Sequence, residues 1–299
     1  MSSLGNAATL PTVRTSRTRT TWHPAFAPFR WFVQQRPALL IPAALLIGVV
    51  VISLLAGVLA PYDPNTLDMQ HMLAKPTSDH WLGTDQLGRD VLSRVLYGGR
   101  TTIVMALIGT AAIITLGLLV GLTTGYIGGK LDLVVSTLLT VLLSVPSLLL
   151  TLAILGILGT GTETLLVALI GAGWVGHARI FRSSVFSLRE SVYVEAAESI
   201  GASRGRVLFR HIMPNLLTTV VVLATLDLGA LILIVTSLSF LGLGVQPPNA
   251  DWGTMLNEAR TYFGQYPILA LAPGICITLV ALLCNLIGDA IRDLVDVGR

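Results

Sequence analysis

The chain has 299 residues, of which 53% are hydrophobic and only 12% are charged, and its mean hydropathy is +0.78. Soluble domains carry about 25% charged residues, so these values exclude a soluble globular protein. The formal net charge of +3 does not indicate nucleic-acid binding, because the basic residues flank apolar runs and do not alternate with aromatic residues.

Hydropathy divides the chain into six long apolar runs. Each is close to or above the roughly 20 residues that an α-helix needs to cross a bilayer. The runs lie at residues 38–60, 101–126, 131–158, 162–181, 216–243 and 267–288. The sequence therefore predicts an all-α membrane protein with six transmembrane helices.

The region before the first apolar run, residues 1–37, contains arginine, threonine and proline but no acidic residue. It predicts a cytoplasmic N-terminal tail, with a regulatory tail as the alternative. The first span, 38–60, ends at Pro61 and is too long for the apolar core of a signal peptide. Since no convincing cleavage site follows it, we expect this span to remain in the protein.

The next region, residues 61–100, is the one long segment predicted outside the cell. Near its end an apolar stripe recurs at helical spacing, formed by Val91, Leu92, Val95 and Leu96. The stripe predicts an interfacial amphipathic helix that leads into the second span. We expect it to be structural, and direct contact with a ligand is the alternative.

The distribution of lysine and arginine predicts the orientation of the chain. Fourteen of these 19 residues lie on the side that holds both termini, namely Arg14, Arg17, Arg19, Arg30, Arg36, Lys130, Arg179, Arg182, Arg189, Arg204, Arg206, Arg210, Arg292 and Arg299. The other five are Lys75, Arg89, Arg94, Arg100 and Arg260. Because basic loops stay in the cytoplasm, both termini are predicted to be cytoplasmic.

Small residues and one proline mark the second and third spans. Gly117, Gly121 and Gly125 recur every four residues, which permits close contact with another helix in a membrane. Pro146, flanked by serines, predicts a kink in the third span. The tandem prolines after the fifth span predict an abrupt external turn, and Trp252 beyond them suits the membrane interface.

A polar, arginine-rich stretch of about forty residues separates the fourth and fifth spans. Its apolar residues Tyr193, Ala196, Ala197 and Ile200 fall at i, i+3, i+4 and i+7, which predicts a short helix with one apolar face. Gly201 is suited to end this helix. Ser203 is suited to cap a second helix, and Pro214 fits the first turn of the next span.

The run from Glu195 to Gly201, with the later Arg-His-Ile-Met-Pro-Asn run that ends at Asn215, resembles the EAA loop of membrane subunits of bacterial ABC importers. The Leu-Gly-Thr-Asp run that ends at Asp85 is similar to a segment of the dipeptide, oligopeptide and nickel permeases. The Ser-Leu-Ser-Phe-Leu-Gly-Leu-Gly run that ends at Gly244 resembles the same family. The resemblance covers residues 75–299. One departure is Val297, which stands where proline is usual.

This resemblance implies the type-I ABC importer permease fold, with a core domain at 101–291 and a cytoplasmic C-terminal tail at 292–299. It further implies that a cytoplasmic coupling helix docks into an ATPase through Tyr193, Glu195, Ala196, Ala197, Ile200, Gly201 and Ala202. The implied partners are a homologous second permease, two ATPase subunits and an external binding protein, in the plasma membrane of a bacterium or archaeon. Among substrates we expect di- or oligopeptides, with nickel chelates or glutathione as alternatives.

The sequence holds no recognisable catalytic machinery. The nearest string to a phosphate-binding loop, which ends at Lys130, has the wrong glycine spacing and no following Ser or Thr. We therefore expect no cofactor on this chain, with ATP and Mg²⁺ bound by partner subunits. Met69, His71 and Met72 are more typical of an ordinary loop than of a metal site, so no metal is expected. Cys276 and Cys284 share one helix and are too far apart for a disulfide.

Asp227 is the exception among the apolar spans, because it falls near the middle of the fifth. An aspartate at the bilayer centre costs about 2.5–3.5 kcal/mol on insertion scales. One reading is a carboxylate on the substrate path that attracts a peptide amine. The other is a neutral buried carboxyl bonded to nearby hydroxyl groups. A rival function, an ion-coupled secondary transporter, would use Asp227 as its ion site.

Overall fold

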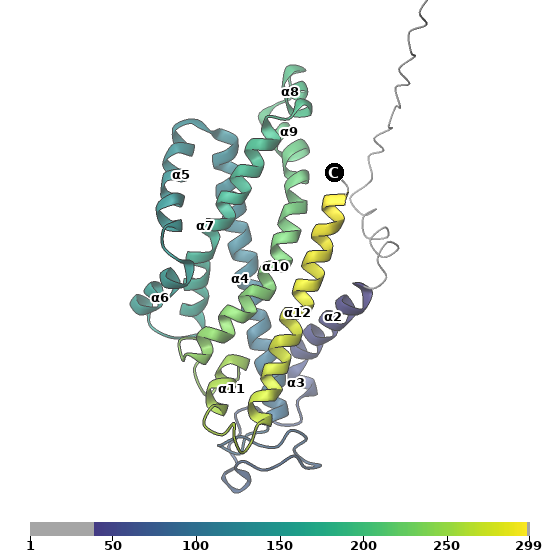
Figure 1. The fold of residues 1–299 in the computed structure, drawn as a ribbon, viewed down its shortest axis with the longest axis vertical. Coiled ribbons are helices and arrows are strands. Elements are labelled where there is room, and N and C mark those ends of the chain that lie inside the picture. The colour runs from purple at the N-terminus through teal and green to yellow at the C-terminus, as the bar shows by residue number, and fades with distance from the viewer. Residues whose placement is uncertain (1–38, 298–299) are drawn as a thin grey trace, which may run out of the picture. The chain divides into compact units, whose positions relative to one another are not determined.

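A computed structural model describes residues 39–297 of the chain, with side chains as far as residue 293, so the predicted tail at 1–37 lies outside the described residues. Within this range there are helices and no β-strand, only an isolated bridge between Thr84 and Asp90. The elements are α2 (Leu40–Leu54), α3 (Ala56–Leu59), η2 (Met69–His71), α4 (Val91–Ile127), α5 (Gly129–Leu143), α6 (Ser147–Leu158), α7 (Thr162–Arg189), α8 (Val192–Ser199), α9 (Arg204–Val207), η3 (Leu208–Ile212), α10 (Met213–Phe240), α11 (Trp252–Ala259) and α12 (Ile268–Val297) (Figure 1).

Four of these helical stretches are long and apolar enough to cross a membrane: Val91–Ile127, Thr162–Arg189, Arg204–Phe240 and Ile268–Asp293. The pair α5 and α6 adds a fifth if its two halves form one broken span. The first predicted span corresponds to the short apolar helices α2 and α3. The described chain is therefore an all-helical membrane protein with four or five candidate spans, and the sixth remains an expectation. Helix α12 continues to Val297, into the predicted C-terminal tail.

The helix predicted before the second span exists, but it is not a separate interfacial helix. Helix α4 runs without interruption from Val91 to Ile127, and Val91 and Arg94 are each only 1% exposed. An amphipathic stripe alone cannot distinguish a surface helix from one whose polar side is buried against charged partners. Here the polar side has such partners, so the first turns of α4 belong to the packed core.

Those partners form a buried ion cluster at the end of the bundle where α11 lies. Arg89 pairs with Asp85 through Nε (2.6 Å) and with Glu258 through Nη2 (2.9 Å). Arg94 contacts the same two carboxylates, at 3.4 Å for Asp85 and 3.0 Å for Glu258. The cluster joins the 61–90 segment, α4 and α11, and it gives a structural role to the arginines of the predicted external segment.

The third predicted span is broken rather than gently kinked. Helices α5 and α6 meet at an angle of 86° around Pro146. Proline lacks a backbone N–H and disfavours helical geometry in the residue before it, so the helix stops there. The hydroxyl of Ser144 donates to the carbonyl of Val141 at 2.6 Å, which satisfies one of the carbonyls freed by the break.

Helix α4 packs closely against α7 through the predicted glycine face. A Cβ placed on Gly117 would lie 2.6 Å from Cβ of His177, and one on Gly121 would lie 2.6 Å from the carbonyl oxygen of Ala178. Any side chain at these positions would push the helices apart. The expectation that small residues permit close helix contact is confirmed.

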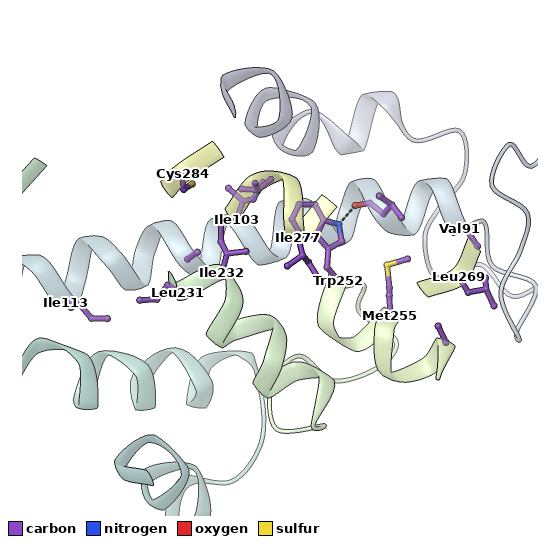
Figure 2. Packing of buried hydrophobic residues seen from close by; sticks show 14 residues of the cluster. Val91, Ile103, Ile113, Leu231, Ile232, Trp252, Met255, Leu269, Ile277 and Cys284 are labelled. Atoms are coloured by element: carbon purple, nitrogen blue, oxygen red, sulfur yellow. Dashed lines mark hydrogen bonds between the residues drawn. The ribbon is translucent and has the colours of Figure 1, made fainter. Parts of the chain in front are cut away.

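Trp252 lies in the core, not at the membrane interface as its position in the sequence suggested. It is 1% exposed, and its indole N–H donates to the carbonyl of Val95 at 2.9 Å (Figure 2). Gly99 leaves room for the ring, because a Cβ there would lie 2.7 Å from it. Cys284 belongs to the same apolar cluster and is a free, fully buried thiol, as expected for a core residue.

Candidate functional site

The loop between α7 and α10 folds as its local signals predict. Helix α8 ends at Ser199, and Gly201 follows the cap residue Ile200 with a φ of +83°, the left-handed conformation that glycine adopts without strain. The N–H of Gly201 donates to Glu198 at 2.9 Å and that of Ala202 donates to Ala197 at 3.1 Å, the pair of bonds that closes a helix in this way. Ser203 caps α9, and Pro214 lies in the first turn of α10.

The predicted apolar face of α8 is divided between two sides of the helix. Ala197 is 7% exposed and turns inward beside Val194, which is fully buried. In contrast, Tyr193 is 44% exposed and Ile200 is 86% exposed. Positions 196 and 197 lie about 100° apart around a helix, so they can belong to opposite edges of a stripe. Ala196 and Glu195 are exposed, like Tyr193 and Ile200.

Val194 anchors α8 to the rest of the chain through an apolar cluster. The other buried members come from α4, α7, the α9–η3 region and α10, namely Leu122, Val185, Val207, Ile212 and Leu216. Sequence reasoning omitted Val194 because it falls between the residues of the assumed face. The cluster anchors α8 at the end of the bundle opposite to α11 (Figure 1).

Two further side chains fasten the ends of this loop, and sequence reasoning missed both. The hydroxyl of Tyr126, at the end of α4, donates to the carbonyl of Arg204 at 2.9 Å. Arg189, at the end of α7, donates to the carbonyl of Tyr126 at 3.2 Å. A hollow of about 390 Å³ is lined by Tyr126, Ile127, Arg189, Glu198, Ala202 and Arg204. The two hydrogen bonds join the ends of α4 and α7 to each other and to the start of α9, which follows α8.

Asp227, the predicted intramembrane carboxylate, has an ionisable partner from another helix. Its Oδ2 forms an ion pair with Nε2 of His177 on α7. Nδ1 of His177 lies 3.1 Å from the carbonyl oxygen of Gly173 on its own helix. The sequence analysis did not single out His177, although it falls in an apolar span, where ionisable residues are rare and mark candidate functional sites.

His71, the histidine considered as a metal ligand, contacts an acidic neighbour. Nδ1 of His71 lies 2.7 Å from Oδ2 of Asp68, and this hydrogen bond lowers the pKa of the Asp68 carboxyl below its usual value. Within residues 39–297 no group of three or more His, Cys, Asp or Glu side chains could hold a metal ion. His71 is accounted for by its contact with Asp68.

Comparison with known proteins places this arrangement in a family. Residues 113–298 match the family of binding-protein-dependent transport system inner membrane components. The chain is 38% identical over 271 residues to the nickel transport system permease protein NikC of Escherichia coli K12, covering 91% of this chain and 96% of NikC. It is 37% identical over 290 residues to the glutathione transport system permease protein GsiD of Pectobacterium atrosepticum, covering 97% and 95%.

A third relative is the dipeptide transport system permease protein DppC of Alkalihalophilus pseudofirmus, at 37% identity over 247 residues, which cover 83% of this chain and 81% of DppC. These matches extend beyond the loop around α8 to nearly the whole described chain. The expected resemblance to the peptide and nickel permeases is thereby confirmed. The chain belongs to the binding-protein-dependent inner membrane components, as a non-catalytic, multi-pass permease subunit of the ABC importers.

Proposed function

We propose that this permease carries di- or oligopeptides across the membrane after an external binding protein delivers them. It would work with a homologous second permease and two ATPase subunits, which bind the ATP and Mg²⁺. The observation that carries the proposal is α8, a short helix that is anchored through Val194 and exposes Tyr193 and Ile200. A helix that is anchored on one side and has exposed apolar side chains on the other is suited to dock into another protein.

The coupling step follows from how α8 is attached. It connects α7 to the α9–α10 region, and its buried residue Val194 belongs to an apolar cluster that also contains residues of α4, α7 and α10. When two ATPase subunits close on ATP and carry α8 with them, the force reaches three long helices at once. Rocking of these helices would open the path alternately to the two sides of the membrane. The chain itself makes and breaks no covalent bond in this scheme.

Peptides are the preferred substrate because relatives named for dipeptide, D,D-dipeptide and glutathione transport all concern peptide-like solutes. The relative named for nickel transport is equally similar, at 38% identity, so nickel chelates remain the alternative cargo. Asp227 is proposed to face the path of the solute. The proposed topology has six spans, with both termini and α8 in the cytoplasm of a bacterial cell.

Affinity purification of the tagged chain from membranes of its own host tests the assembly. We expect each copy of the chain to be accompanied by one homologous permease and two ATPase subunits. When the complex is placed in vesicles with its binding protein, uptake of a labelled dipeptide should require ATP. A chain that purifies without an ATPase, or that transports equally without ATP, would contradict the proposal.

Cysteine labelling tests the proposed topology. In a chain with Cys276→Ala and Cys284→Ala, single cysteines replace Ser78 and Ser203, both of which are exposed. We expect an impermeant thiol reagent to label Ser78→Cys in intact cells and to label Ser203→Cys only after permeabilisation. The proposed orientation places fourteen of the 19 basic residues in the cytoplasm. The opposite labelling pattern would show that the orientation is inverted.

A further inference from the structure

His177 and Asp227 meet where two long helices cross the middle of the membrane region. Each residue lies close to the midpoint of its helix, His177 in α7 (Thr162–Arg189) and Asp227 in α10 (Met213–Phe240). Helix α7 runs directly into α8, and α10 follows the α9–η3 region. The ion pair thus joins the two helices that flank the proposed coupling helix.

The hydrogen bonds of His177 define how many protons the pair holds. The carbonyl oxygen of Gly173 can only accept, so Nδ1 of His177 must carry a hydrogen and donate to it. Nε2 of His177 lies in contact with Oδ2 of Asp227. Two lone-pair atoms at such a distance repel each other unless a proton lies between them, so we assign one more proton to the pair. Whether it belongs to the imidazole or to the carboxyl, the sum of the two charges is zero.

Helix α4 holds His177 in this position. Its Gly117 has no side chain, and a Cβ there would lie 2.6 Å from Cβ of His177 and 3.1 Å from N of Ala178. The histidine therefore packs against the backbone of α4 on one side while its ring reaches α10 on the other. Burial of an unpaired charge at this depth would be costly, and the pairing removes that cost.

The pair is also partly open. The side chain of His177 is 16% exposed and that of Asp227 is 22% exposed in the single subunit. Ionisable side chains within membrane spans face the bundle interior or a water-filled cavity, because contact with hydrocarbon is costly. The exposed part of the His177–Asp227 pair is therefore suited to line the path along which a polar solute passes.

We propose that His177 is a specificity-determining residue of the transport path, which neutralises Asp227 so that the path at mid-depth offers hydrogen bonds without net charge. The solutes that fit such a surface are zwitterions with no net charge, such as dipeptides of neutral residues. This inference rests on the proposed function, because it requires that Asp227 faces the solute.

The test compares uptake of a neutral dipeptide, Ala-Ala, with uptake of a cationic one, Ala-Lys, by the complete complex in vesicles with its binding protein. His177→Gln keeps a donor for Asp227 but removes the neutralising proton, so the path gains a negative charge. We expect the ratio of Ala-Lys to Ala-Ala uptake to rise about tenfold. His177→Tyr, which also keeps a donor, should shift the ratio in the same direction if the glutamine variant does not fold.

Two matched variants separate charge from packing. Asp227→Asn leaves a neutral pair, so its uptake ratio should stay near that of the wild type. In the double variant His177→Gln with Asp227→Asn the path is again neutral, and the ratio should return to the wild-type value. A purely structural role for the pair would lower the uptake of both dipeptides alike and would not predict this return.

Three results would overturn the inference. The first is an unchanged uptake ratio in both single His177 variants while ATP-driven uptake persists. The second is loss of the second permease from the purified complex of these variants, which would make the pair a subunit contact. If the wild-type complex transports neither dipeptide, the proposed function fails and the inference fails with it, a result that is distinct from the first two.

Discussion

Ile200→Glu is expected to abolish ATP-driven uptake while the chain still folds and inserts. Ile200 is 86% exposed at the end of α8, so a glutamate there meets water in the free subunit and disturbs no packing. In the complex, the same carboxylate would be buried in the apolar groove of the ATPase. Loss of an interface hot spot of about 2 kcal/mol weakens association about 30-fold.

The measurement is the amount of ATPase that purifies with the variant, followed by uptake in vesicles. Leu67→Glu is the matched control, because Leu67 is also a large aliphatic side chain and is 56% exposed. It lies in the segment before α4, at the opposite end of the bundle from α8. It should retain the ATPase. Ala197→Glu should behave differently from both, because it places a charge in a 7% exposed position and destabilises the loop itself. Normal ATPase binding by Ile200→Glu would remove Ile200 from the docking surface.

Glu258→Ala is expected to lower the free energy of unfolding by about 3 kcal/mol, near the low end of what breaking a buried ion pair costs. Glu258 accepts from both Arg89 and Arg94, at 2.9 and 3.0 Å. Without it, Asp85 is the one carboxylate of the cluster left to two buried guanidinium groups, and Arg94 keeps its bonds to the carbonyls of Pro64 and Pro248. The side chain of Glu258 is itself 17% exposed, which is why the lower end of the range applies.

Chemical unfolding of the purified chain in detergent micelles measures this loss. Asp79→Ala serves as the control, since Asp79 lies in the 61–90 segment that the cluster joins to α11 but is itself exposed. It should change the free energy of unfolding by less than about 0.5 kcal/mol. If Glu258→Ala were as stable as this control, the cluster would contribute little, and the 61–90 segment would be held to α11 by its apolar contacts alone.

Backbone signals in the sequence were reliable because they act over a few residues. Gly201 ends α8 because a left-handed residue is needed there, and Ser203 caps α9 with its own side chain. Pro146 breaks the third apolar run for an equally local reason. Each of these effects is a property of the chain near one residue, so no knowledge of distant contacts was required to predict it.

Burial could not be predicted in the same way. Trp252 was expected at the membrane interface, yet Gly98 and Gly99 of a distant helix open a space that encloses it. Ala197 was expected on an outward face, but Val194 beside it is the residue that anchors α8. An amphipathic pattern states that a helix has two sides. It does not state which side meets the protein when both carry apolar residues.

By itself the sequence determined that this is a helical membrane protein of the ABC importer permeases. The signals that show this are local: each apolar run, each glycine or proline position and the motif around α8 occupies a short stretch of the chain. Only the tertiary structure decided which charges neutralise each other. His177 and Asp227 are 50 residues apart, and Arg89 and Glu258 are separated by 169 residues. Such pairs form because an unpaired charge in a low-dielectric interior is costly, and the partner that removes the cost is chosen by helix packing.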